Sequence, residues 1–413
     1  MMRSATPVRT TLAGLCLAGS LLAPLRMTAQ IDRRNPPTPG PAPAVQLGSH
    51  STFTLPNGIR VIVVENHKLP LASVQVRFDI PPVRQGDKTG YIDLMGDLLA
   101  SGTATRSKAQ IDEEVEKLGG ALFTSSDGAY ASGLKKHLPA LLDVLQDVVT
   151  APAFPEREFE KVRTRYRSSV QQRKDDPDAI AEAVGRAATY GRTHPYGEVM
   201  SEKTLDNVAL KHINGYYRRF FRPENAYLVF VGDITTKEAK ELAKNAFGKW
   251  KPALPGMTLD DNGNEIVDGL GTVEVLKQPV TAAGVRRVQL VDRPGSAQSV
   301  IRVTFPLNLQ PKDNRALAAQ VMNTILGGGV FNARLMQNLR EDKAWTYGAY
   351  SSLDADRFNG SFTASVSVRN AVTDSAVSEI VKELERMRTE GVTTEELELA
   401  KKYMAGSFAR SLE

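Results

Sequence analysis

Cysteine and histidine are scarce in this 413-residue sequence, and each shortage excludes a kind of chemistry. The one cysteine, Cys16, lies in an N-terminal apolar run that we expect to be removed, so the remaining chain has no disulfide and no thiol nucleophile. The five histidines are His50, His67, His137, His194 and His212. No two of them are three to five residues apart, which excludes a local pair of histidine zinc ligands.

Basic charge is also in small excess, and most of that excess lies at the N-terminus. The formal net charge is +5, and residues 1–29 carry three arginines and no acidic residue, so their removal lowers it to +2. A nearly neutral chain without a basic cluster is not expected to bind nucleic acid or an anionic membrane.

The N-terminus has the pattern of a secretory signal peptide. Two arginines precede an apolar run from Leu12 to Leu25, and the small residue Ala29 follows it. We therefore expect residues 1–29 to be cleaved near Ala29 and the protein to be periplasmic or secreted. The run is too short for stable membrane insertion, and Leu15 stands where a lipid anchor on Cys16 would need a small residue. The proline-rich residues 30–50 are expected to form an extended tether.

The apolar patterns that follow predict an α+β fold with two homologous domains. Each domain is expected to be a mainly antiparallel sheet with helices packed on it. The alternating segments Gly58–Glu65 and Ser73–Phe78 are repeated by Gly284–Asp292 and Ser299–Phe305. The expected boundaries are 51–252 for the first domain, 253–281 for a linker and 282–413 for the second domain.

The segment Gly90 to Thr103 reads as one amphipathic helix that ends at a glycine. Asp93 and Asp97 lie four residues apart on one face of this helix, which is a spacing that metal ligands use. Two carboxylates alone offer a calcium or magnesium ion too few oxygens. We therefore expect Asp93 and Asp97 to be solvated carboxylates.

Four short motifs carry a resemblance to a known family: the helix 90–102, the turn His194-Pro195-Tyr196-Gly197, the strand end Val231-Gly232-Asp233, and the run from Ile325 to Tyr347. They resemble the pitrilysin/insulinase family of zinc peptidases, the inverzincins, and in particular the two-domain subunits of mitochondrial processing peptidase. In that family the sequence H-x-x-E-H supplies two zinc ligands and a general base.

The resemblance implies that the zinc site of this chain is lost. Asp93 and Asp97 stand at the two histidine positions, and Gly96 stands at the position of the general base. The third family ligand, a glutamate, maps near Ser168-Ser169, where no acid is present. We therefore expect no metal and no cofactor in this chain. The resemblance also implies that the second domain is truncated, because a further helix and a closing strand are expected.

A second family feature is kept. Arg340 and Tyr347 match a pair seven residues apart that grips substrate opposite the zinc, and a guanidinium and a phenol are suitable donors to a peptide carbonyl or an oxyanion. The resemblance places Gly327, Gly328 and Gly329 close to the zinc-bearing half of a partner, and it implies that these glycines also contact the substrate. Without it, Arg340 would be a surface ion-pair residue, Tyr347 a core residue and Gly327 a helix cap. A phosphate loop is excluded because no Gly-Lys-Ser/Thr follows the glycines.

These observations predict a catalytically silent subunit of a periplasmic zinc metallopeptidase heterodimer. Arg340 and Tyr347 would contact the peptide substrate, and a homologous partner with H-x-x-E-H would provide zinc. Two alternatives stay open. One is a non-proteolytic structural or peptide-binding module of the same fold, and the other is an independent peptidase that holds a different metal through Asp93 and Asp97. The preferred peptide sequence, and whether the chain pairs with itself or with another chain, do not follow from the sequence.

Overall fold

A computed structural model of the protein describes residues 48–251, 256–260, 264–276, 280, 284, 286–329 and 331–411. The predicted signal peptide, residues 1–29, and the predicted tether up to residue 47 lie outside the described residues. Within the described part of the chain, none of the helices combines the length and the apolar character needed to span a bilayer.

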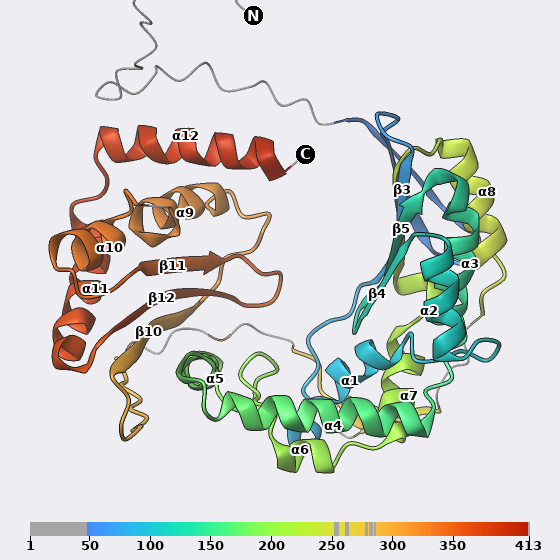
Figure 1. Cartoon of the computed structure of the whole chain (residues 1–413), viewed down its shortest axis with the longest axis horizontal. Coiled ribbons are helices and arrows are strands. Elements are labelled where there is room, and N and C mark those ends of the chain that lie inside the picture. The colour runs from blue at the N-terminus through green and yellow to red at the C-terminus, as the bar shows by residue number, and fades with distance from the viewer. Residues whose placement is uncertain are drawn as a thin grey trace, which may run out of the picture. The chain divides into compact units, whose positions relative to one another are not determined.

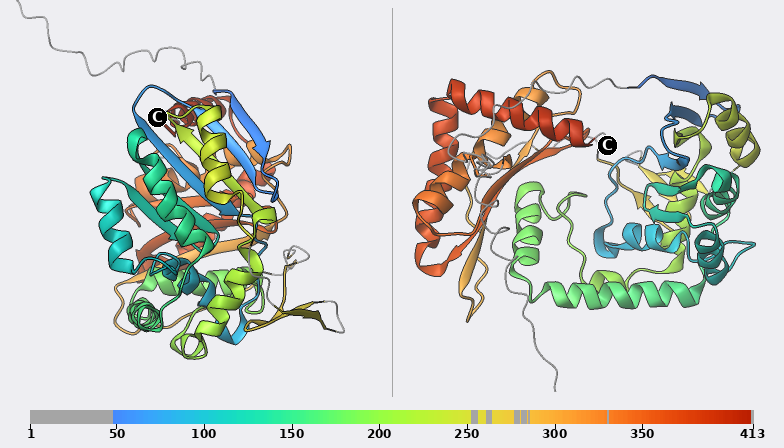
Figure 2. Two further views of the ribbon diagram at one scale, coloured as in Figure 1. Left: turned by 90° about the vertical axis from the view of Figure 1, so that its right-hand side faces the viewer. Right: turned by 45° about the horizontal axis from the view of Figure 1, so that its top comes forward.

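The first half is built on a six-stranded sheet with helices on one face (Figures 1 and 2). The strands are β1 His50–Thr54, β2 Arg60–Glu65, β3 Leu71–Phe78, β4 Ala121–Ser125, β5 Gly128–Leu134 and β6 Ala226–Gly232, in the order β1-β2-β6-β3-β5-β4. Every pair is antiparallel except β2–β6. The alternating residues Val61, Val63, Val74 and Val76 point into the core and are at most 2% exposed, as the period of two predicts.

The helices of the first half pack on this sheet and around its end. They are α1 Tyr91–Leu98, α2 Lys108–Lys117, α3 Leu138–Thr150, α4 Glu156–Arg173, α5 Pro177–Tyr190, α6 Glu202–Asp206, α7 Leu210–Phe220 and α8 Thr236–Phe247. Helices α3 and α8 contact the sheet through β3, β5 and β2, whereas α1 packs against α4, α7 and β4. The predicted capping box Thr235/Glu238 is present at the start of α8.

Short strands form within the segment predicted as a linker. They are β7 Met257–Leu259, β8 Glu265–Val267 and β9 Gly271–Val273, which make a small antiparallel sheet. Val267, Leu270 and Val273 belong to the apolar cluster of the first half. This part of residues 253–281 is therefore anchored to the first core.

The second half repeats part of the first with a three-stranded antiparallel sheet. Its strands are β10 Gln298–Leu307, β11 Ala349–Asp354 and β12 Gly360–Arg369, in the order β10-β12-β11. Its helices are α9 Ala316–Asn323, α10 Arg334–Met336, α11 Thr373–Thr389 and α12 Thr394–Ser411, with π-helical turns at Thr324–Gly328 and Gln337–Asp342. The order β10-β12-β11 corresponds to β3-β5-β4 of the first half, so the two halves share an α+β plan (Figure 1). The predicted capping box Thr393/Glu396 is also present.

The strand predicted within Gly284–Asp292 is absent from its described residues 286–292, so this prediction was wrong. The matching strand of the first half, β2, gains its hydrogen bonds from β1 on one side and β6 on the other. The described part of the second sheet contains neither of these neighbours, and Val288 and Leu290 are both 89% exposed. A pattern of alternating residues forms a strand only where another strand pairs with it.

Candidate functional site

Helix α1 is positioned by a glycine and a glutamine at its start. Gly90 has φ of 116°, a conformation that favours glycine, and the side chain of Gln85 accepts hydrogen bonds from the backbone nitrogens of Gly90 and Ile92 at 2.9 and 3.3 Å. One face of α1 is buried through Leu94 and Met95, which are fully inaccessible. The opposite side of the helix therefore carries its two carboxylates to the surface.

Asp93 is exposed, yet protein atoms around it raise the pKa of its carboxyl group by restricting water. The charge of Asp97 raises this pKa further, and the charges of Arg186 and Arg173 oppose the rise. The neighbours of Asp93 are thus the protein's own guanidinium groups. No neutral imidazole stands at this position.

Asp97 is bound to helix α4. Its Oδ2 accepts a hydrogen bond from Nη2 of Arg165 at 2.5 Å. Burial raises the pKa of the Tyr166 hydroxyl, and the adjacent Asp97 carboxylate raises it further, so the phenol stays protonated next to that charge. A cation from α4 therefore balances the charge of the Asp97 carboxylate.

Gly96, at the position of the family's general base, is closed off by backbone. A Cβ atom on Gly96 would lie 2.5 Å from the nitrogen of Ser126, in the turn between β4 and β5, and 2.7 Å from the carbonyl carbon of Ser125, the last residue of β4. Atoms at these distances overlap, and the obstacle is a hairpin backbone rather than a flexible side chain. A glutamate at residue 96 does not fit this structure.

Ser169 lies where the third family ligand is expected. Arg165 contacts Asp97, and the charge of Arg173 acts on Asp93, so Ser169 is midway between them on the same face of α4. Ser169 offers a hydroxyl where the family has a carboxylate.

These residues do not fit zinc. Zinc sites use imidazole, thiolate and a few carboxylates, whereas the positions here supply two aspartates next to arginines. Among the residues that the structure describes, no group of three or more histidine, cysteine, aspartate or glutamate side chains could hold a metal ion. His194 and His212 are buried, and His67 is exposed beside Asp233.

Arg340 and Tyr347 are brought together in the second half. The guanidinium carbon of Arg340 lies 5.2 Å from the ring centre of Tyr347 and 5.0 Å from that of Phe331. The Tyr347 residue is 87% exposed, so it is not the core residue that the alternative reading expected. Among the residues that the structure describes, Arg340 makes one loose ion pair, to Glu341 at 3.5 Å. The two aromatic rings orient the guanidinium and leave it able to bind another group.

Close packing accounts for each of the three glycines, against backbone at Gly327 and Gly329 and against a side chain at Gly328. A Cβ atom on Gly327 would lie 2.7 Å from the backbone nitrogen of Ser351 in β11, and one on Gly329 would lie 2.7 Å from the carbonyl oxygen of Thr324. A Cβ on Gly328 would collide with the side chain of Asn323. The glycines are thus required by the fold of the turn that ends α9. Contact between these glycines and a substrate stays a prediction.

Reasoning from the sequence missed Arg165, Tyr166 and Phe331. A signal for Arg165 was available, because it precedes the expected ligand position Ser169 by one helical turn. No pattern marked Phe331, since its distance from Arg340 is set by the π-helical turn Gln337–Asp342.

The paired α+β halves and the altered metal helix define a two-domain protein of the peptidase type, and comparison with known proteins gives the family. The model of the insulinase family, peptidase family M16, matches residues 60–201, and the model of the peptidase M16 inactive domain matches residues 207–404. This chain belongs to peptidase family M16. The resemblance seen in the sequence is therefore confirmed.

Several relatives carry names that bear on activity. The chain is similar to an uncharacterized zinc protease, YmxG, of Bacillus subtilis, with 26% identity over 87% of this chain and 84% of the relative. It is also similar to a protein named non-peptidase homolog YmxG of Helicobacter pylori, with 19% identity over 84% of this chain and 77% of that protein. The fold matches the crystal structure of a peptidase M16 inactive domain from Pseudomonas fluorescens, with a TM-score of 0.72, 24% identity and coverage of 87% and 84%.

Proposed function

We propose that this chain is the non-catalytic subunit of a two-chain zinc peptidase. In this proposal a homologous partner with H-x-x-E-H holds the zinc and the general base, and this chain donates hydrogen bonds to the peptide substrate from Arg340 and Tyr347. The predicted signal peptide assigns the complex to the periplasm or the exterior.

The observation that carries the proposal is the closure of the metal helix. The backbone of Ser125 and Ser126 leaves no space for a side chain at Gly96, and Arg165 neutralises Asp97. A chain that had kept hydrolysis would need an acid at residue 96 and neutral metal ligands beside it. The kept pair Arg340 and Tyr347 supports a role in substrate binding, because both side chains present donors to solvent.

The name of the relative in Helicobacter pylori, a non-peptidase homologue, supports the loss of activity. It supports a non-proteolytic structural or peptide-binding module equally well, and this module is the second candidate function. The third reading, an independent peptidase with a metal between Asp93 and Asp97, has less support, because the arginines beside these carboxylates disfavour a cation.

The test compares this chain, an H-x-x-E-H homologue from the same organism, and a mixture of the two. Cleavage of a quenched fluorescent, unstructured peptide is measured with and without a chelator, and zinc is measured by elemental analysis. We expect no cleavage and no stoichiometric zinc for this chain alone, and faster cleavage by the mixture than by the partner alone.

Stoichiometric zinc or chelator-sensitive cleavage in the purified chain alone would overturn the proposal. Peptide binding by the chain, without any gain of activity in the mixture, would instead support the non-proteolytic module. Gel filtration of the mixture separates these outcomes from a simple failure of the two chains to associate.

A further inference from the structure

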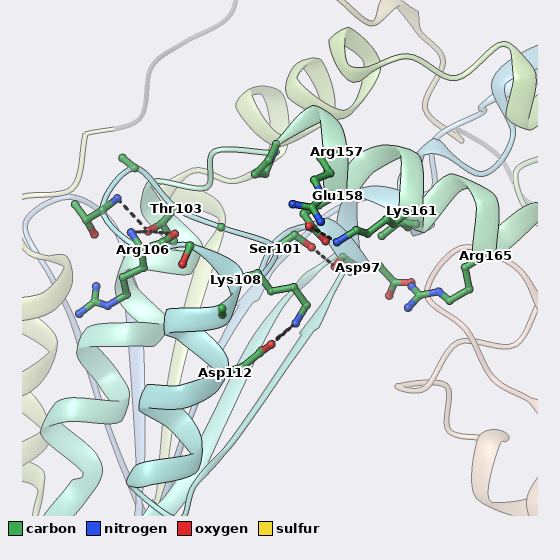
Figure 3. A pocket seen from close by; sticks show the side chains of 17 residues that line it. Asp97, Ser101, Thr103, Arg106, Lys108, Asp112, Arg157, Glu158, Lys161 and Arg165 are labelled. Carbon is green, nitrogen blue, oxygen red and sulfur yellow. Dashed lines mark hydrogen bonds and ion pairs between the residues drawn. The ribbon is translucent and has the colours of Figure 1, made fainter.

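A charged groove lies next to the altered metal helix, and of the residues on which the proposed function rests it includes only Asp97 and Arg165. Its volume is about 970 Å³, and it is bounded by the C-terminal end of α1, the start of α2 and the first half of α4 (Figure 3). Five of its lining residues are basic, Arg106, Lys108, Arg157, Lys161 and Arg165, against three that are acidic, Asp97, Asp112 and Glu158. The groove therefore has an excess of positive charge.

Three of the basic side chains form a row on one helix. Arg157, Lys161 and Arg165 are spaced four residues apart along α4, so they share one face, as Figure 3 shows. Four residues of α-helix rise about 6 Å, and the row therefore spans about 12 Å. Side chains on one face of an extended peptide repeat every 6.5 to 7 Å or so. Carboxylates at alternate positions of an extended peptide would match this row.

The cations in the groove already hold carboxylates of this chain, which shows the chemistry they select. Lys161 contacts Glu158 at 2.7 Å, Arg165 contacts Asp97 at 2.5 Å, and Lys108 contacts Asp112 at 2.7 Å. The side chains of Lys161 and Arg165 are 55% and 64% exposed, and ion pairs this exposed are weak and exchange readily with an incoming carboxylate.

Within the described chain, the other two basic residues of the groove, Arg157 and Arg106, do not form exposed, exchangeable ion pairs of this kind. Arg157 is exposed and has no ion-pair partner among the residues that the structure describes, so it is free to bind a ligand. Arg106 is bound by Glu114, Asp143 and Asp147 and serves the fold. The available cations are thus those of α4 together with Lys108.

The lining disfavours two other anions. None of the seventeen residues that line the groove is aromatic, so a nucleic-acid base would find no ring to stack on. A single phosphate needs donors that converge on one point, whereas these cations are spread along a helix. Small and hydroxyl side chains such as Ala104, Thr105 and Ser107 leave room for a peptide backbone.

We propose that the groove between α1, α2 and α4 binds an extended acidic peptide with carboxylates at alternate positions. The site is separate from Arg340 and Tyr347 and needs neither a partner subunit nor catalysis. The proposal can therefore fail or succeed independently of the proposed peptidase complex.

Fluorescence anisotropy with the whole chain and a labelled peptide of alternating serine and glutamate tests this site. We expect saturable binding that weakens as ionic strength rises. The double variant Arg157→Gln/Lys161→Gln should weaken binding roughly tenfold or more, because two exposed cation–carboxylate contacts are lost. Lys108→Gln, on a different helix, should weaken it to a smaller extent.

The matched control is Lys117→Gln/Lys136→Gln, which removes the same charge from exposed positions outside the groove. It should bind the peptide as the unchanged chain does. An equal loss of affinity in both double variants would overturn the proposal, as would an unaltered affinity in Arg157→Gln/Lys161→Gln.

Three further probes define the ligand class. A peptide of the same composition with contiguous glutamates, and a peptide of alternating serine and lysine, should bind more weakly. Displacement of the acidic peptide by inorganic phosphate or by single-stranded DNA at similar concentrations would overturn the assignment to a peptide.

Discussion

The two halves of this chain share a strand order but differ in what they leave open to a ligand. In the first half the family's metal helix is closed, because a hairpin backbone packs on Gly96 and Arg165 is bound to Asp97. In the second half Tyr347 is 87% exposed, and Arg340 lies against two aromatic rings and makes a loose ion pair with Glu341.

This difference shows that the first half fills the positions of the family's metal site with atoms of its own. Once the metal ligands are aspartates, a cation of the chain can replace the metal, and the space of a catalytic side chain can be filled by backbone. In the second half, the acidic partner of Arg340 among the described residues is Glu341, at 3.5 Å. A half-buried arginine beside an exposed tyrosine contributes little to the core, and such a pair is explained more easily by a binding role than by stability.

The largest expected effect is on peptidase turnover and concerns Arg340 and Tyr347 in the second half. In the mixture with a zinc-bearing partner, Arg340→Ala should lower kcat by roughly a hundredfold or more, as the loss of a charged donor to a developing oxyanion does. Tyr347→Phe should cost less, since it removes one neutral hydroxyl donor. Steady-state cleavage of the quenched peptide measures both values.

The control for these variants is Lys401→Ala, at an exposed position of α12 whose side chain pairs with Glu398 on the same helix. It should leave turnover as it was. Unchanged turnover in Arg340→Ala, with the complex intact by gel filtration, would remove the functional contrast between the halves.

The next largest effect is on stability and concerns the packing of Gly96 in the first half. Gly96→Ala should destabilise the chain by about 2–4 kcal/mol, because its Cβ overlaps the backbone of Ser125 and Ser126 and the hairpin must move. Gly406→Ala in α12 is the matched control. A Cβ there meets no atom within 4 Å, so the change should stabilise the helix by up to about 1 kcal/mol. Thermal unfolding of both variants is the measurement, and equal unfolding midpoints would show that the helix is not closed.

The sequence predicted the α+β fold and the altered metal positions because these depend on local patterns. The period of two in β3, the capping boxes of α8 and α12, and the spacing of Asp93 and Asp97 are read within a few residues. The unformed strand at residues 286–292 shows the limit of this approach. Whether those residues pair depends on strands far away in the sequence, and no local pattern reports their presence.

The contact of the β4–β5 hairpin backbone with Gly96 also could not be predicted, because it too depends on residues far away in the sequence. It depends on Ser125 and Ser126, about thirty residues later, and on how tightly α1 packs on β4. The sequence showed that the general base was missing, but not that its space was filled.

The halves should also respond differently to acid. Burial lowers the pKa of His212 in α7 to about 4, from 6.5 when unfolded. As the pH falls, the His212 imidazole therefore binds a proton in the unfolded chain before it does so in the folded chain. The contribution of His212 to stability is full above pH 6.5 and falls by up to about 3 kcal/mol as the pH drops to 4.

The Arg334 guanidinium lowers the pKa of Glu396 in α12 to about 2, from 4.5. Stability from that pair is present above pH 4.5 and is lost as the pH falls to 2.

Hydrogen exchange of peptides from α7 and α12, followed against pH, separates the two responses. His212→Asn keeps an acceptor for the backbone nitrogen of Ala209 and should flatten the change between pH 6.5 and 4. Glu396→Gln should flatten the change below pH 4.5. Loss of protection in both helices over one common pH range would mean that the halves unfold as one unit.

A smaller effect is expected from the ion pair between α1 and α4. Arg165 and Asp97 are exposed, with side chains 64% and 38% accessible, so Arg165→Ala should change the free energy of unfolding by about 1 kcal/mol or less. Urea denaturation of this variant measures the difference. A much larger loss would mean that the pair holds α4 in place as well as neutralising Asp97.

The smallest expected effect is zinc uptake after partial repair of the metal helix. Asp93→His/Asp97→His leaves Gly96 unaltered and avoids the overlap with the hairpin, but Ser169 offers no carboxylate as a third ligand. We therefore expect no stoichiometric zinc by elemental analysis after dialysis, and weak uptake only once Ser169→Glu is added. The same holds for Asp93→His/Gly96→Glu/Asp97→His, which also lacks the third ligand. Tight zinc binding by the double variant would place the third ligand elsewhere than on α4, and the first half would then be closer to an active site than its hairpin suggests.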